Sequence, residues 1–150
     1  MLSFLNKYSD NGVFCFYPTD RPFQECNAPN DKSGVYLVYA VFENKESLVY
    51  IGSSGKILAN GEISIRGGLG GIKGRLIEGR YSYKQDGKRI KMNRAKFWIA
   101  QMNKEKFLKL KIYWFVTHNF VFRDCPLKKD AELRALHRTL YGRLPAWNRI

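Results

Sequence analysis

The chain has 150 residues, of which 26 are Lys or Arg and 13 are Asp or Glu, so it carries a net charge of +13. Its 45% hydrophobic and 15% aromatic content argues against disorder and predicts a domain with its own core. The sequence contains no apolar run of about 18 residues, no signal-peptide pattern and no metal-ligand spacing among its three cysteines. These absences predict a cytoplasmic protein that contacts no membrane.

The first 33 residues are expected to form an irregular arm. Pro18, Pro22 and Pro29 interrupt this stretch, and residues 30–33 have the composition of a loop. The stretch is too short for an independent domain. We therefore divide the chain into an N-terminal arm, which packs on the core or grips substrate, and a single domain over residues 34–150.

A β-hairpin is predicted directly after the arm. Two runs rich in β-branched and aromatic residues, 34–42 and 48–51, flank a short polar turn. Because side chains alternate along a strand, antiparallel pairing could bring Tyr36 and Tyr50 close together. The register that would decide this is not fixed by the sequence.

Helical periodicity and one further strand account for most of the remaining chain. Together with the hairpin, this order predicts an α+β fold in which a small, mostly antiparallel three-stranded sheet is flanked by helices. The predicted segments are a Gly- and Ser-rich loop at 53–71 with a short extra strand at 61–66 as an alternative, a short helix at 72–79, a basic loop at 81–91, a helix at 93–106, a strand at 110–116 and a helix from Pro126 onward.

The positive charge is concentrated in the middle of the chain. Residues 51–113 contain fifteen Lys and Arg against four Asp and Glu, whereas residues 1–50 contain four against six. Such a localised field suits a polyanion, because each neutralised phosphate releases counterions. A basic surface that serves only solubility is the alternative, and the asymmetry favours a nucleic-acid partner.

Two short motifs give the most specific information about function. Gly34-Val35-Tyr36 and Tyr50-Ile51-Gly52 each place a tyrosine beside a glycine on a predicted strand. The pair resembles the motif that names the GIY-YIG nuclease family, with Val35 in place of isoleucine and a slightly longer spacing between the tyrosines. This resemblance covers about residues 34–148, and it implies a GIY-YIG-like fold and a metal-dependent DNA endonuclease that hydrolyses phosphodiester bonds.

Residues farther along the chain match the other positions that the family uses. An arginine lies on the first predicted helix after the second motif, a glutamate lies on the last helix, and an asparagine follows in residues 144–148. The catalytic residues implied by the resemblance are Tyr36, Tyr50, Arg75, Glu132 and Asn148, with Arg66 and Arg80 as alternatives to Arg75, and Asp130 as the alternative to Glu132.

The resemblance also implies a role for each of these residue types. Glu132 would hold Mg²⁺ (or Mn²⁺), which can keep several waters while bound to one carboxylate and can stabilise the departing oxygen. Arg75 would hold the scissile phosphate, since a guanidinium binds phosphate bidentately and stays charged. One tyrosine would orient or deprotonate the attacking water, and the sequence does not distinguish Tyr36 from Tyr50 in this role.

The compact plan and the long second loop resemble the restriction-endonuclease branch of the family. One departure from the family pattern is Gly79, which stands where many members carry His or Tyr. Because of this departure, a non-catalytic basic nucleic-acid-binding module is the alternative function. Double-stranded DNA is the expected partner, and cutting both strands would need a homodimer or successive nicks. The expected DNA contacts are Lys56, Arg66, Lys73, Arg80, Lys84, Lys88, Arg89 and Lys91.

Overall fold

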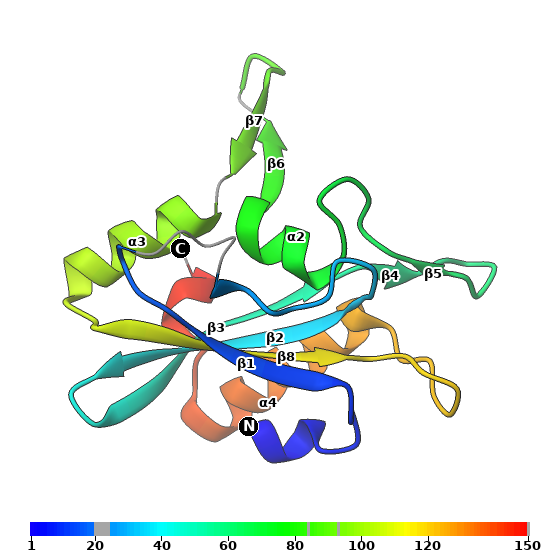
Figure 1. Ribbon diagram of the computed structural model, residues 1–150, viewed down its shortest axis with the longest axis horizontal. Coiled ribbons are helices and arrows are strands. Elements are labelled where there is room, and N and C mark those ends of the chain that lie inside the picture. The colour runs from blue at the N-terminus through cyan, green and yellow to red at the C-terminus, as the bar shows by residue number, and fades with distance from the viewer. Residues whose placement is uncertain (20–24, 84, 93, 150) are drawn as a thin grey trace.

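The computed structural model describes residues 1–19, 25–83, 85–92 and 94–149. A four-stranded antiparallel sheet in the order β1-β8-β2-β3 forms the centre of the molecule (Figure 1). The α+β class is therefore confirmed, with one strand more than the sequence predicts. The strands are β1 (Asn11–Phe16), β2 (Gly34–Phe42), β3 (Lys45–Ser54) and β8 (Lys109–Val116).

The additional strand comes from the stretch that we expected to be an irregular arm. Asn11–Phe16 pairs with β8 along its whole length, so β1 is an edge strand of the central sheet. A short 3-10 helix, η1 (Leu2–Leu5), precedes β1 and contributes the buried Leu5. The first residues of the chain are thus part of the same packed unit as the sheet.

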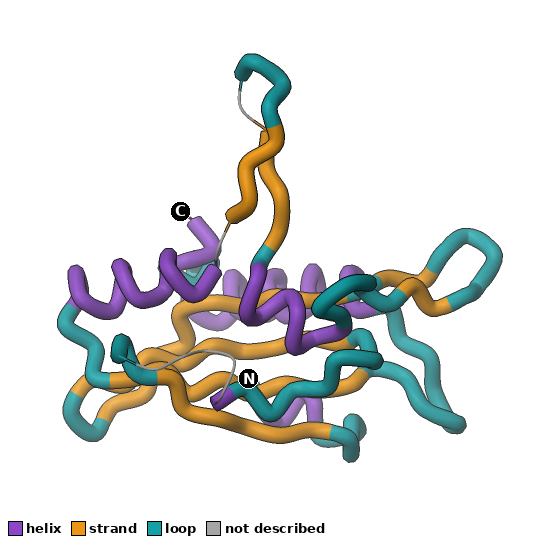
Figure 2. Tube along the Cα trace, turned by 45° about the horizontal axis from the view of Figure 1, so that its top comes forward, coloured by secondary structure: helices purple, strands orange, loops and turns teal. Residues whose placement is uncertain are grey.

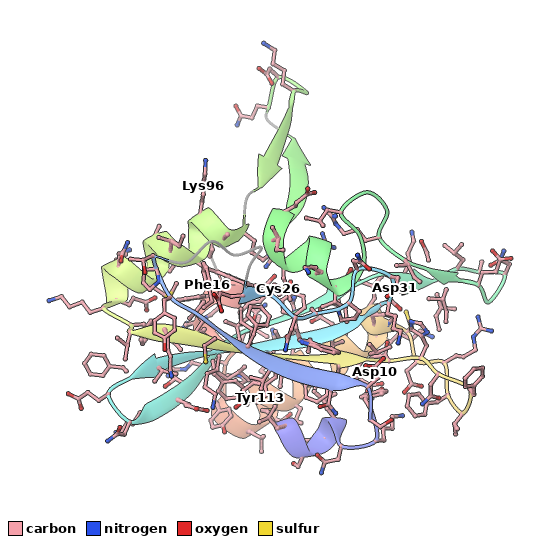
Figure 3. All side chains as sticks on the ribbon, viewed as in Figure 1. Asp10, Phe16, Cys26, Asp31, Lys96 and Tyr113 are labelled. Carbon is pink, nitrogen blue, oxygen red and sulfur yellow. The ribbon has the colours of Figure 1, made fainter. Side chains whose placement is uncertain are left out.

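Helices cover both faces of the sheet, so the fold has three layers (Figure 1). On one face lie α2 (Gly71–Glu78) and α3 (Arg94–Glu105), and on the other lie α4 (Pro126–Tyr141) and η1. Figure 3 shows Phe16 and Cys26 on the side of α2 and α3, and Tyr113 on the side of α4, in agreement with the two apolar clusters that these layers enclose. Within the described residues, no helix combines the length and apolar character needed to cross a bilayer.

Two small hairpins extend from this core. One consists of β4 (Lys56–Ile57) and β5 (Ile63–Ser64), which realises the alternative short strand within the first predicted loop. The other consists of β6 (Arg80–Tyr83) and β7 (Arg89–Met92), where the sequence analysis expected an irregular basic loop. Figure 2 shows this second hairpin projecting from between α2 and α3, well away from the sheet.

The C-terminal residues return to the sheet. After α4 ends at a left-handed Gly142, a second 3-10 helix, η2 (Ala146–Arg149), brings Trp147 into the core on the side of α3. The indole nitrogen of Trp147 donates a hydrogen bond to Glu105 Oε2 at 2.7 Å. This contact holds the end of the chain against α3, beside the edge strand β3.

Candidate active site at the edge of strand β3

A pocket of about 160 Å³ lies where α2, α3 and α4 meet the edge strand β3. Its walls come from both helical layers, and residues of β2 and β3 lie between them. Five of its side chains are ionisable cations or phenols, and one is a carboxylate. The lining residues are Tyr36, Tyr50, Gly52, Ser53, Arg75, Arg94, Leu127, Asp130 and Arg134.

The two predicted tyrosines lie side by side in this pocket. In the β2–β3 register, Tyr36 is opposite Gly52 and Val38 is opposite Tyr50, which puts both phenol rings on the same face of the sheet. Their ring centroids are 6.1 Å apart and the rings are nearly parallel. Tyr36 is completely buried, and its hydroxyl has no hydrogen-bond partner among the described residues. Burial raises the pKa of Tyr36, so this phenol is protonated at neutral pH.

Both glycines of the paired motifs are required by close approach rather than by chain flexibility. A Cβ atom on Gly52 would lie 2.4 Å from Cζ and 2.5 Å from the hydroxyl oxygen of Tyr36. A Cβ atom on Gly34 would lie 2.0 Å from the carbonyl oxygen of Phe115 on the neighbouring strand β8. Gly52 therefore makes the room in which the Tyr36 ring is held, and Gly34 allows β2 to pack against β8.

Two arginines extend into the pocket from the helices above the sheet. Arg75, on α2, donates from Nε to the carbonyl oxygen of Ser53 at 3.2 Å. Arg94, the first residue of α3, lies with its guanidinium carbon 4.7 Å from the ring centroid of Tyr50. Burial lowers the pKa of Arg75, whereas at Arg94 the nearby tyrosines outweigh burial and raise the pKa. Both groups are cations at neutral pH.

Asp130 supplies the carboxylate of the pocket. It is buried, and its Oδ1 accepts a 2.6 Å hydrogen bond from Nε of Arg134 one turn along α4. Its Oδ2 accepts a hydrogen bond from the hydroxyl of Ser53 at 2.9 Å. Arg134 also donates to the carbonyl oxygen of Ile51 at 3.2 Å. This network connects α4 to strand β3.

Glu132, which the sequence analysis places at the metal, lies outside this pocket. Residues two apart on a helix are separated by about 200° around its axis, so Glu132 and Asp130 point in different directions. The Glu132 side chain is 64% exposed and pairs with Lys129 at 2.7 Å. It lines a second, larger pocket of about 620 Å³ on the other side of the first turns of α4.

Asn148 lies next to the site and stabilises strand β3. Its Oδ1 accepts a hydrogen bond from the backbone N–H of Ile51 at 2.8 Å, and its Nδ2 donates to the carbonyl oxygen of the same residue at 2.9 Å. Ile51 lies between Tyr50 and Gly52, so Asn148 fixes the part of β3 that carries the pocket. Asn148 therefore acts as a positioning residue: it holds strand β3 and is not among the residues that line the pocket.

The predicted DNA contacts are spread over several environments. Lys56 and Lys88 are exposed, whereas the guanidinium of Arg66 is tied to the carbonyl oxygens of Leu69 and Gly79 and to Glu78. Lys73 is half-buried on α2. Arg80, Arg89 and Lys91 occupy positions on the projecting hairpin β6–β7, and Lys84 lies outside the described residues.

Three polar side chains of the pocket have no place in the set that the sequence implies. Ser53 follows the second motif by one residue, and only the fold shows that its hydroxyl meets Asp130. Arg134 could be found as the (i, i+4) partner of Asp130, a spacing that favours an ion pair on a helix. Arg94 has no comparable local pattern, because its neighbours in the pocket come from distant strands.

Comparison of this chain with protein-family models, with curated proteins and with solved structures gives no match. The function is therefore inferred from the residues of the pocket. In the described part of the chain, no group of three or more His, Cys, Asp or Glu side chains could together enclose a metal ion. A divalent cation at this site would accordingly depend on one carboxylate, with waters and substrate oxygens as its other ligands.

Proposed function

We propose that the protein is a metal-dependent endonuclease that hydrolyses DNA phosphodiesters in the pocket at β3. The observation that carries this proposal is the buried hydroxyl of Tyr36, which has no hydrogen-bond partner among the described residues and lines a pocket that also contains three guanidinium groups. An unpaired buried hydroxyl is unfavourable unless a ligand completes its hydrogen bonding. An anion with several acceptor oxygens would do so.

The size and charge of the pocket support a phosphate group as that anion. A volume of about 160 Å³ corresponds to a few water molecules at roughly 30 Å³ each. This space accommodates a phosphate and an attacking water, whereas the sugars and bases of a polynucleotide would lie on the outer surface. Arg75, Arg94 and Arg134 supply positive charge where the phosphoryl oxygens would gain negative charge. The net charge of +13 supports a long polyanion as the substrate.

The two tyrosines would take different roles. Because burial keeps Tyr36 protonated, its hydroxyl would donate a hydrogen bond to a phosphoryl oxygen or to the attacking water. Tyr50 is less buried and has the Arg94 cation over its ring, so it is the phenol placed to orient the water. Arg75 is fixed by Ser53 and would hold the scissile phosphate.

The carboxylate that fits a metal role in this pocket is Asp130. An ionised carboxylate has about four acceptor positions, and the hydrogen bonds from Ser53 and Arg134 leave part of that capacity available. Mg²⁺ or Mn²⁺ bound by Asp130 and substrate oxygens would stabilise the leaving oxygen as a Lewis acid. The sequence-based assignment of this role to Glu132 is the competing hypothesis, since Glu132 lines the larger pocket instead.

Cleavage of supercoiled plasmid tests the proposal. Wild-type protein should nick or cut the plasmid in Mg²⁺ and not in EDTA, and discrete fragments would support a type II restriction-like enzyme. Tyr36→Phe removes an oxygen that has no hydrogen-bond partner among the described residues, so it should fold normally and lose most activity. Asp130→Asn should abolish cleavage, whereas Glu132→Gln should retain it. The reverse order for the last two variants would return the metal role to Glu132.

A basic nucleic-acid-binding module without catalysis is the second candidate. The observation that favours it is the engagement of both Asp130 oxygens within the protein, by Arg134 and Ser53. Such a module would retard DNA in Mg²⁺, Mn²⁺ and EDTA alike and leave every plasmid intact. This result, obtained with folded wild-type protein, would reject the nuclease.

A further inference from the structure

Two neighbouring apolar side chains stand fully in solvent at one tip of the molecule. Phe120 is 109% exposed and Val121 is 88% exposed, the two highest values for large apolar side chains in the described part of the chain. They occupy the turn that leads from β8 to α4. Single exposed apolar residues are common on protein surfaces, whereas these two adjacent ones form a small apolar patch.

Hydrogen bonds hold this turn in shape. The Oδ1 atom of Asn119 accepts from the backbone N–H groups of Val121 at 2.7 Å and Phe122 at 3.0 Å, and the backbone N–H of Asn119 donates to the carbonyl oxygen of Phe122 at 2.8 Å. The Phe122 ring packs edge-on against Tyr8, with 5.2 Å between ring centroids. Phe120 and Val121 are thus presented by an anchored turn.

The surface next to this turn is basic. The larger pocket, of about 620 Å³, is lined by four cationic side chains and two anionic ones. Asp124, one of the anionic pair, is already bonded to Lys7 and Tyr8, each at 2.6 Å. Glu132, the other anion, pairs with Lys129 at 2.7 Å, so among the described residues the positive excess of this pocket comes from Arg123 and Lys128. The four cations are Lys7, Arg123, Lys128 and Lys129.

The basic surface is continuous with the candidate active site through the first turns of α4. Leu127 and Asp130 line the smaller pocket, while Lys128 and Lys129 line the larger one. A polyanion whose phosphate lay in the smaller pocket would have to cross or flank the start of α4. Phe120 lies in the turn between β8 and α4, six residues before this helix begins.

We propose that the Phe120–Val121 turn is an apolar wedge that enters duplex DNA at a base step, while Arg123 and Lys128 of the larger pocket hold the flanking phosphates. Phenylalanine is among the side chains that proteins insert between base pairs. Insertion kinks the duplex, and the bent DNA can then contact more of the protein surface. The identity of the partner rests on the proposed function. An anionic lipid surface would also attract cations and an exposed Phe, but continuity with a phosphate-sized pocket favours DNA.

The test uses the full-length protein in EDTA, so that binding is observed without cleavage. Fluorescence anisotropy measures affinity for a labelled duplex, and a set of duplexes with 2-aminopurine at successive positions reports unstacking. Wild-type protein should raise 2-aminopurine fluorescence. Phe120→Ala should abolish this rise and weaken binding about tenfold, in line with the loss of one stacking contact. Phe120→Trp should restore both.

The matched control is Phe42→Ala. Phe42 is 48% exposed and lies at the β2–β3 turn, at the end of the sheet opposite to the wedge, and its replacement should change neither signal. Equal affinity and fluorescence for wild type and Phe120→Ala would overturn the wedge. The nuclease would still be supported in that case if Tyr36→Phe lost plasmid cleavage and Phe120→Ala kept it. Failure of wild-type protein to bind any duplex would overturn both. Binding to phosphatidylserine vesicles that depends on Phe120, with DNA binding unaffected, would overturn the wedge in favour of a membrane contact.

Discussion

At the scale of single residues, the pocket depends on where one glycine leaves room. The Tyr36 ring occupies the space over Gly52 that a methyl group would need, so the phenol and the strand are packed as one unit. The Tyr36 hydroxyl lies over Gly52 as well, and it is buried without a hydrogen-bond partner among the described residues. One small residue thus sets the position of a candidate catalytic group.

The substitution Gly52→Ala should therefore destabilise the fold and disturb the pocket. A Cβ 2.4 Å from the Tyr36 ring forces the ring or strand to move, and overpacking of this kind costs about 1–3 kcal/mol. Urea unfolding should show a lower midpoint with an unchanged slope. Gly67→Ala is the control, because a Cβ there meets nothing within 4 Å. Equal destabilisation by the two changes would contradict the packing argument.

The sequence predicts the tyrosine pair better than the carboxylate. Side chains alternate along antiparallel strands, so the sequence predicts that Tyr36 and Tyr50 could lie on one face of the hairpin. In the structure their rings are neighbours on that face. Asp130 and Glu132 differ by two positions on one helix, and the rotation of α4 that chooses between them is set by packing against β3. The buried face of α4 carries Asp130 together with Leu133 and His137, whereas Glu132 is on the exposed face.

At the scale of elements, the N-terminal segment is joined to the start of α4. The hydroxyl of Tyr8, which follows η1, donates a 2.6 Å hydrogen bond to Asp124, two residues before α4 begins. Burial alone would raise the pKa of Asp124, but hydrogen bonds from Lys7 and Tyr8 outweigh it and lower the pKa. Burial raises the pKa of Tyr8, so the phenol remains a donor at neutral pH.

We expect Tyr8→Phe to lower stability at pH 7 by about 1.5–3 kcal/mol, the usual range for a hydrogen bond to a charged group. Because the folded-state pKa of Asp124 lies below its ordinary value, its contribution is present above that ordinary value and is lost as pH falls through the folded-state pKa. The stability difference between wild type and variant should therefore shrink below about pH 4. Thermal unfolding across pH measures it, with the exposed Tyr141→Phe as control. A difference that grows on acidification would refute this assignment.

Strand β1 shows why one element was missed. Its six residues are followed by several prolines, so local composition favours irregular structure. The strand forms because β8, almost one hundred residues later, offers an open edge and because Phe16 completes a buried cluster. Pairing over such a separation leaves little trace in a short window of sequence. Strands β2 and β8 were predictable because they are longer and richer in β-branched and aromatic residues, and β3 because its apolar run at 48–51 follows β2 across a short polar turn.

At the scale of the whole molecule, some cationic side chains are bonded within the protein and others are exposed to solvent. Arg66 is held by Glu78 and backbone carbonyls, whereas Lys88 is exposed on the projecting hairpin β6–β7. A charge that is tied into the fold contributes less to phosphate binding than one at the surface. Exposed cations such as Lys88 are therefore better candidates for DNA contacts than cations bonded within the protein, such as Arg66.

Salt titration of DNA binding should separate these two kinds of cation. Each contacted phosphate contributes about −0.9 to the slope of log K against log salt, so Lys88→Ala should make the slope shallower by about one. Arg66→Ala should lower the melting temperature and leave the slope unchanged. Lys45→Ala, at the exposed β2–β3 turn, is the surface control and should change neither quantity. A slope that responds to Lys45 as much as to Lys88 would indicate a diffuse charge effect.

Strand β3 has one further consequence, because it is the outermost strand on its side of the sheet. An uncovered strand edge is where a second chain can add a strand of its own. Between Ile51 and Ser53 this edge is closed by the side chains of Asn148, Arg134 and Arg75, which occupy the outward backbone groups. These side chains thus also occupy backbone groups with which a second chain could otherwise pair. A variant at Asn148 made to study catalysis would open a template for aggregation at the same place.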